Sequence, residues 1–249
     1  MMTSSWQSVH SWYDKKLGDS GDWTHKNIVT PKTITLLSLS STSTLLDLGC
    51  GQGIFARAIP PAIPYVGVDL SPSLIASAKK RDKNTKHTYI TGDITTPLHL
   101  QNTFSHAVCI LTLDNIKNIS LVLRYTFHYL EPKGIFVFVI NHPCFRIPRQ
   151  SGWEVDKESK LQYRRINRYL SPLEIPISMH PGQTQKTTTW TFHYPLSSYS
   201  AWLEQSGFVI EKIEEWISDK TSVGNTAKME NRSRSEFPLF LAIRAKKLS

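Results

Sequence analysis

Three alternating glycines, Gly49, Gly51 and Gly53, follow a short apolar segment that contains one acid, Asp47. Glycine lacks a Cβ atom, so this loop can turn sharply and let a ligand approach its backbone closely. Twenty residues after Gly49, a second apolar segment ends in Asp69. An acid at the tip of the strand after a glycine loop can accept hydrogen bonds from both hydroxyls of a ribose. The pattern therefore predicts a nucleotide-type ligand.

The spacing excludes two common nucleotide sites. A dinucleotide fingerprint needs glycine at position 54, where this chain has Ile54, and a P-loop needs a Gly-Lys-Ser/Thr sequence that is absent. The apolar segment 45–48 is typical of a buried parallel strand. Residues 54–59 predict a short helix that Pro60 ends. Strand, glycine loop and helix together indicate the first unit of a nucleotide-binding α/β fold.

The sequences LLDLGCGQG (45–53) and VGVDLSPSLIASAKK (66–80) resemble the class I S-adenosylmethionine (SAM) dependent methyltransferases. Within that family, the chain is most similar to the branch of quinone-biosynthesis and other small-molecule methyltransferases. The resemblance extends over 44–142 and, more weakly, over 193–215 and 236–246. It implies an α/β fold with a doubly wound, Rossmann-like mixed sheet of seven strands, the last two antiparallel.

The resemblance also implies SAM as cofactor and S-adenosylhomocysteine as product, with no metal. The glycine loop would admit the methionine part of SAM, Asp47 would lie near its amino group, and Asp69 would hold the ribose. Asp93 would bind the adenine amino group while Ile94 packs on the ring. The cofactor-binding residues expected are Asp47, Gly49, Cys50, Gly51, Gly53, Asp69, Leu70, Asp93, Ile94 and Leu111.

Four residues are expected on the acceptor side: Tyr13, Asp114, Asn115 and Arg146. Tyr13 belongs to an N-terminal amphipathic helix that, in the family resembled, closes over SAM. Asp114 and Asn115 follow the fourth strand, at the edge where α/β proteins bind ligands. They either orient an acceptor or cap the next helix, and the sequence does not separate these alternatives.

Two histidines are candidate catalytic bases. His142 follows the apolar strand 135–140, so we expect its ring in the acceptor pocket, where it could take a proton at neutral pH. His193 begins a later segment and is a second, weaker candidate. The alternative interpretation of His142 is a loop histidine with satisfied hydrogen bonds.

The chain is interpreted as one domain in four segments. Residues 1–43 form a helical cap, 44–141 the SAM-binding core, 142–186 an insert, and 187–249 the C-terminal strands and helix. The insert shows no helix or strand period, mixes basic with aromatic residues, and is expected to be a lid over the acceptor pocket. Residues 220–234 are expected to form a loop.

Composition limits the partners. The net charge of +9 fits an anionic small molecule, a nucleic acid or an acidic membrane surface. No apolar segment is long enough to span a membrane, and no secretory segment begins the chain, so a cytoplasmic location is expected. We expect a small anionic or aromatic acceptor. The alternatives are a tRNA-modifying methyltransferase and a non-catalytic SAM-binding subunit, and the oligomeric state is not indicated.

Overall fold

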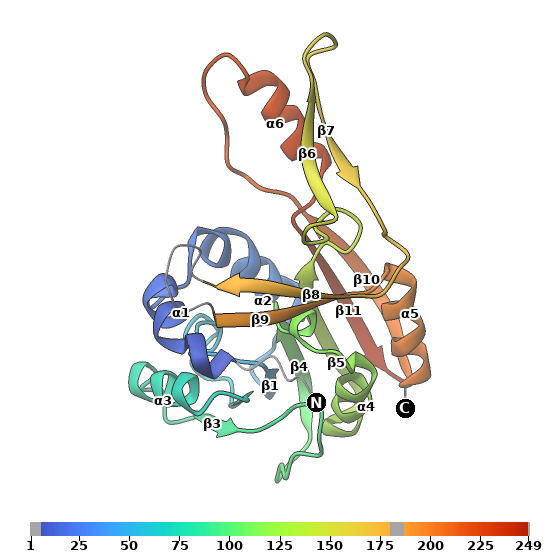
Figure 1. The fold of residues 1–249 in the computed structure, drawn as a ribbon. Helices are drawn as coiled ribbons and strands as arrows, with labels where there is room; N and C mark the ends of the chain where they lie inside the picture. Colours follow the sequence, from blue (N-terminus) through green and yellow to red (C-terminus); the bar gives the residue numbers. More distant parts are fainter. Residues whose placement is uncertain (1–5, 180–186, 249) are drawn as a thin grey trace.

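The computed structural model describes residues 6–179 and 187–248, and its central element is a seven-stranded sheet in the order β10-β11-β5-β4-β1-β2-β3 (Figure 1). Strands β1 to β5 run parallel, whereas β11 is antiparallel to both β5 and β10. This is the mixed Rossmann-like sheet expected. The strands are β1 (Leu45–Leu48), β2 (Tyr65–Asp69), β3 (His87–Thr91), β4 (Phe104–Ile110), β5 (Leu130–Asn141), β10 (Phe208–Trp216) and β11 (Phe240–Lys247).

Helices cover both faces of the sheet, because the central strands are apolar on both sides. One hydrophobic cluster joins the sheet to η2 (His25–Val29), α2 (Thr30–Leu37) and α3 (Pro72–Arg81). The opposite cluster joins it to α4 (Ile119–Tyr129) and α5 (Leu196–Gln205). The first elements described are η1 (Trp6–Val9) and α1 (His10–Leu17), and α1 packs on α3. In Figure 1, α2 and α3 lie on one side of the sheet and α4 and α5 on the other.

The prediction of a helix over residues 54–59 is wrong, because this segment forms a succession of turns. Gly49, Gly51 and Gly53 all have positive φ, so helical geometry cannot begin before Ile54. Pro60 then leaves only six residues, too few for the backbone hydrogen bonds to offset the cost of starting a helix.

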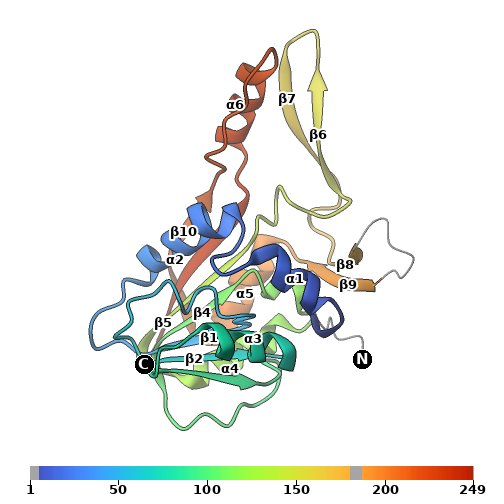
Figure 2. The same ribbon diagram turned by 90° about the vertical axis from the view of Figure 1, so that its left-hand side faces the viewer.

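The insert contains three strands that sequence analysis did not predict. A hairpin of β6 (Ser151–Asp156) and β7 (Leu161–Ile166) projects from the sheet, and β8 (Leu173–Met179) pairs with β9 (Thr187–His193). The expected loop 220–234 instead contains most of α6 (Ala227–Glu236), which packs against β7 (Figures 1 and 2). Neither the hairpin nor α6 buries a continuous apolar face, so neither carries the hydrophobic period on which prediction depends.

The glycine loop gives a test of the packing. A Cβ atom on Gly49 would lie 2.8 Å from Thr112 Cβ at a φ of +84°, whereas a Cβ on Gly18, at +56°, would meet nothing within 4 Å. We expect Gly49→Ala to lower the free energy of unfolding by about 2–5 kcal/mol, since strain adds to overpacking. Gly18→Ala should lower it by about 1–2 kcal/mol from strain alone. Urea denaturation measures both, and equal losses would contradict the packing argument.

Candidate functional site

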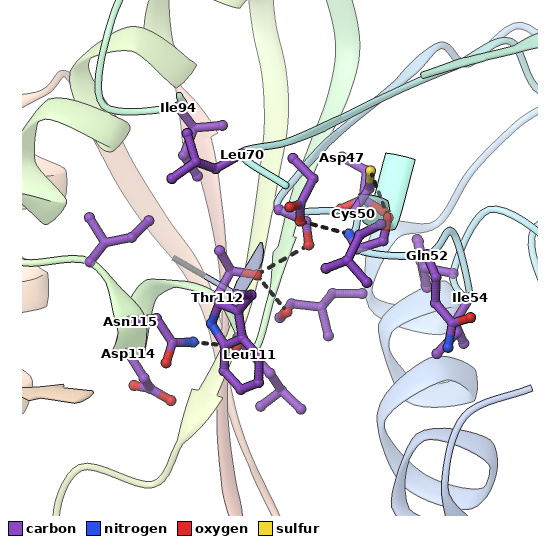
Figure 3. A pocket seen from close by; sticks show the side chains of 18 of the residues that line it. Asp47, Cys50, Gln52, Ile54, Leu70, Ile94, Leu111, Thr112, Asp114 and Asn115 are labelled. Carbon is purple, nitrogen blue, oxygen red and sulfur yellow. Dashed lines mark hydrogen bonds between the residues drawn. The ribbon is translucent and has the colours of Figure 1, made fainter. Parts of the chain in front are cut away.

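A cavity of about 380 Å³ opens at the carboxyl ends of the parallel strands (Figure 3). Its volume is in the range of small-molecule and cofactor sites. Its walls come from the N-terminal helices, the glycine loop, the ends of β2, β3, β4 and β5, and the β8–β9 ribbon. The polar or charged residues among them are His25, Thr30, Asp47, Gln52, Asp69, Asp93, Thr112, Asp114, Asn115, Asn141, Thr189 and Thr191.

Asp69 lies at the tip of β2 and joins the glycine loop to the start of α3. One oxygen, Oδ2, accepts a hydrogen bond from the Gly51 N–H at 2.9 Å, and Oδ1 accepts one from the Ser71 N–H at 2.8 Å. Burial raises the pKa of Asp69, and these two bonds oppose the rise. Leu70, which follows it, is 42% exposed and lines the cavity. The carboxylate is therefore held in place at the cavity wall.

Asp47 is buried within β1, beside Cys50 (Figure 3). Its Oδ2 accepts a hydrogen bond from the Tyr65 hydroxyl at 2.7 Å. Burial raises the pKa of Asp47 to about 7; the Tyr65 hydrogen bond opposes this rise, and the charge of Asp69 adds to it. A cation in the cavity would favour the ionised form of Asp47.

Two of the three glycines, Gly49 and Gly53, lack a side chain for different reasons. Gly49 and Gly51 line the cavity, and the absent Cβ of Gly49 makes room for Thr112, whose hydroxyl donates to the Gly49 carbonyl. Gly53 does not line the cavity, contrary to expectation. A Cβ atom there would lie 2.7 Å from the Tyr89 hydroxyl, so Gly53 is required by packing behind the loop.

The ends of β3 and β4 supply three further wall residues. Asp93 and Ile94 line the cavity, and Asp93 Oδ1 accepts hydrogen bonds from the backbone N–H and hydroxyl of Thr95. Leu111 also lines it, with a φ of 52° that is unusual for a residue with a side chain. Such strained conformations gather at functional sites, because the surrounding structure must hold them.

Asp114 and Asn115 belong to the short helix η3 (Leu113–Asn115) and line the cavity opposite Asp47 (Figure 3). Asp114 Oδ2 accepts hydrogen bonds from the backbone N–H and side-chain Nδ2 of Asn141, both at 2.9 Å. Burial raises the pKa of Asp114 to about 6. The residue at the N-cap of α4 is Asn118, so neither Asp114 nor Asn115 caps that helix.

The ring of His142 does not lie in the cavity, so that expectation is wrong. The side chain is only 1% exposed, and its Nε2 bonds to Glu215 Oε1 at 2.7 Å. Its Nδ1 accepts from the Cys144 N–H at 3.2 Å. The turn that begins at Pro143 carries the ring toward β10, and a buried imidazole is stable there because both nitrogens have partners. His142 is a positioned loop histidine.

His193 and Arg146 line a separate, adjoining space of about 20 Å³, too small for more than a water molecule. His193 Nε2 donates to the Tyr169 carbonyl at 2.7 Å. The Arg146 guanidinium lies over the Trp153 ring. Neither lines the larger cavity, contrary to their expected catalytic and acceptor-binding roles. The side chain of Tyr13 lies outside the described residues.

Several wall residues were missed by sequence analysis. Gln52 is 1% exposed, donates through Nε2 to the Gly18 carbonyl, and has a buried Oε1 with no partner among the described residues. His25 also lines the cavity, and its Nδ1 lies 2.8 Å from Asp22 Oδ1. The position of Gln52 between two loop glycines was a signal that could have identified it. Thr189 and Thr191 could not be identified from the sequence, because they line the cavity as part of the β8–β9 ribbon.

Residues 25–213 match the protein family described as "Methyltransferase domain". A malonyl-[acyl-carrier protein] O-methyltransferase of Bacillus anthracis is 29% identical over 104 residues, which are 41% of this chain and 38% of the relative. The chain thus spans less than half the length of the curated relatives it matches.

Solved structures extend the comparison to nearly the whole fold. An S-adenosylmethionine dependent methyltransferase from Mesorhizobium loti is 26% identical with a TM-score of 0.69, covering 87% of this chain and 96% of that one. A structure from Listeria monocytogenes, described as an S-adenosylmethionine dependent methyltransferase, is 22% identical with a TM-score of 0.68, covering 88% and 97%. At this identity, the second likeness shows the fold alone.

Within residues 6–179 and 187–248, no group of three His, Cys, Asp or Glu side chains is arranged to hold a metal ion. None of the helices described is both long and apolar enough to span a membrane.

The raised pKa of Asp47 predicts a pH-dependent stability. Between about pH 4 and pH 7 the folded protein binds more protons at this site than the unfolded chain, so the free energy of unfolding should fall as pH rises through this window. We expect Asp47→Asn to reduce that fall and to add about 2–4 kcal/mol at pH 8. Urea denaturation without cofactor measures this. An exposed control, Asp219→Asn, should keep the wild-type dependence, and an identical profile for Asp47→Asn would contradict the prediction.

Proposed function

Since the chain belongs to the methyltransferase-domain family that its residues 25–213 match, and is a SAM-dependent methyltransferase, we propose that it methylates a small molecule bound in the 380 Å³ cavity. The observation that carries this proposal is a shared wall. Asp47, Asp69 and Asp93, which the resemblance links to SAM, line the same cavity as Asp114 and Asn115.

The residues present fit SAM. The cavity is large enough for a nucleoside, and Gln52 Oε1 is a buried acceptor with no protein partner among the described residues, which a ligand amino group would satisfy. We assign the ribose to Asp69, the adenine to Asp93 and Ile94, and the ammonium to the region of Asp47. Leu70, Cys50 and Leu111 complete the apolar part of the wall.

SAM supplies a methyl group on a positively charged sulfur, which is already a strong electrophile. The chain's own residues therefore need mainly to align the acceptor and exclude water. Ile177, Thr189 and Thr191 of the β8–β9 ribbon form one wall of the cavity. We propose that this ribbon, and not the whole insert 142–186, is the lid.

The alternatives have weaker support. In the projecting hairpin, Arg164 donates to the Phe145 carbonyl at 2.7 Å, and Arg165 pairs with Glu154 at 2.7 Å. These cations already have protein partners, which weighs against a tRNA-binding surface. A non-catalytic SAM-binding subunit would need Asp47, Asp69 and Asp93 for the cofactor, but it would not need an acceptor side with Asp114 and Asn115 in the same cavity. The free buried thiols of Cys50 and Cys109 fit a reducing compartment, and we propose the cytosol.

Replacing Asp69 tests the cofactor assignment. We expect Asp69→Ala to weaken SAM binding by about 1.5–3 kcal/mol, since charge-assisted hydrogen bonds are lost. Isothermal titration calorimetry measures the affinity, with Asp219→Asn as an exposed control that should bind SAM like the wild type. An unchanged affinity of the Asp69 variant would remove this residue from the site.

The acceptor class is tested with SAM that carries a labelled methyl group. The protein is incubated with a metabolite extract freed of macromolecules or, separately, with total RNA. We expect label in the small-molecule fraction and none in RNA. RNA labelling that falls when Arg164 and Arg165 are neutralised would replace this proposal with the tRNA alternative.

A further inference from the structure

The acceptor side of the cavity contains a carboxylate that the cofactor assignment leaves unused. Asp114 is 8% exposed and lines both the large cavity and the small adjoining one. Asp47, Asp69 and Asp93 are assigned to SAM, but Asp114 comes from a different element, η3, beyond the end of β4. It faces the cavity from the side opposite Asp47 (Figure 3).

Only half of the hydrogen-bonding capacity of Asp114 is used by the protein. Both hydrogen bonds from Asn141 go to Oδ2, and Oδ1 accepts none from the residues that the structure describes. Oδ1 is therefore free to accept a hydrogen bond from a donor in the cavity. Since Asp114 lines the cavity, a ligand can supply that donor.

Among the described residues, no cation forms an ion pair with Asp114. The described residues that line the large cavity include four aspartates and His25, but no lysine or arginine. The charge of Asp114 adds to the pKa of Tyr199 and of Cys109. Burial raises the pKa of both groups, so both stay neutral. Arg146 lines only the small space; its charge acts on the pKa of His142, whereas the pKa of Asp114 is set by burial and by the hydrogen bonds from Asn141. A carboxylate or phosphate acceptor would therefore meet negative charge without a partner.

We propose that the acceptor is a small primary or secondary amine whose nitrogen is bound by Asp114. This inference rests on the proposed function and specifies its substrate. An amine suits the site because its N–H groups can donate to Oδ1, and because the positive charge that forms on the nitrogen during methyl transfer would be offset by the Asp114 carboxylate. The surrounding Asn115, Asn141, Thr189 and Thr191 side chains are neutral and polar.

The reaction balances with this assignment. The acceptor enters as the neutral amine after its proton has passed to solvent, and its N–H donates to Asp114. The nitrogen lone pair forms the new bond to the methyl carbon as the bond from that carbon to sulfur breaks, and the electron pair stays on sulfur. The resulting ammonium passes one proton to Asp114 and from there to water. Asp114 thus acts as a binding group and as a proton acceptor after transfer.

The first experiment needs no acceptor. Sinefungin is an analogue of S-adenosylhomocysteine in which an amine-bearing carbon replaces the sulfur, so it places an ammonium beside the transfer position. We expect calorimetry to show that sinefungin binds at least about 10-fold more tightly than S-adenosylhomocysteine, as charge pairing predicts. Asp114→Asn should bring the two affinities to within about 2-fold while leaving that of S-adenosylhomocysteine unchanged.

The amide variant keeps the fold because its carbonyl oxygen can still accept both hydrogen bonds from Asn141, and thermal unfolding verifies this. The exposed control Asp219→Asn should keep the sinefungin preference. A preference that survives Asp114→Asn would overturn the assignment of Asp114. A wild-type protein that binds neither sinefungin nor S-adenosylhomocysteine would instead contradict the proposed function itself.

The second experiment identifies the chemical class of the acceptor. The metabolite extract is divided on cation- and anion-exchange resins, and part of it is acetylated to block amines. We expect methyl acceptance to be retained by the cation exchanger and lost on acetylation. Acceptance that is retained by the anion exchanger, or that survives acetylation, would overturn the proposal.

Discussion

The hydrogen bond from the Gly51 N–H to Asp69 holds the site together, because it connects the glycine loop after β1 to the tip of β2. A second bond, from the Thr112 hydroxyl to the Gly49 carbonyl, ties the same loop to the end of β4. The loop is thus fixed between two strands of the sheet. Without these bonds, a loop in which Gly49, Gly51 and Gly53 all have positive φ would have many alternative conformations.

The electrostatics of the cavity follow from where the acids lie. Asp47, Asp69 and Asp114 are removed from water and have mostly neutral hydrogen-bond partners, so burial raises the pKa of each. Buried acids of this kind reduce the stability of the folded chain at neutral pH. A positively charged ligand offsets that cost, and SAM carries positive charge on its sulfur and its amino group.

The insert after β5 has two structural roles. The β6–β7 hairpin and α6 extend together away from the central sheet (Figure 2). Trp153 of the hairpin packs edge-on against Phe237. The β8–β9 ribbon instead contributes Ile177, Thr189 and Thr191 to the cavity wall. A pair of strands can cover a site while leaving the central sheet unchanged, since its hydrogen bonds are internal.

The sequence alone determined the individual strands of the sheet core, the glycine loop and the acids in or just after β1, β2 and β3, because each depends on residues close together in the chain, whereas the seven-stranded mixed sheet was implied by the family resemblance. Period-2 or continuous apolar segments bounded by glycine or proline identify strands locally. The same local signals failed for residues 54–59, where glycine and proline left too little chain for a helix.

Only the tertiary structure decided which polar side chains meet. His142 was predicted from its position at a strand end, but the turn at Pro143 and the distant Glu215 direct its ring into the protein. Asn141, Thr191 and Asp114 converge because η3 contacts both the end of β5 and the separate β8–β9 ribbon, and such long-range contacts leave no periodic signal in the sequence.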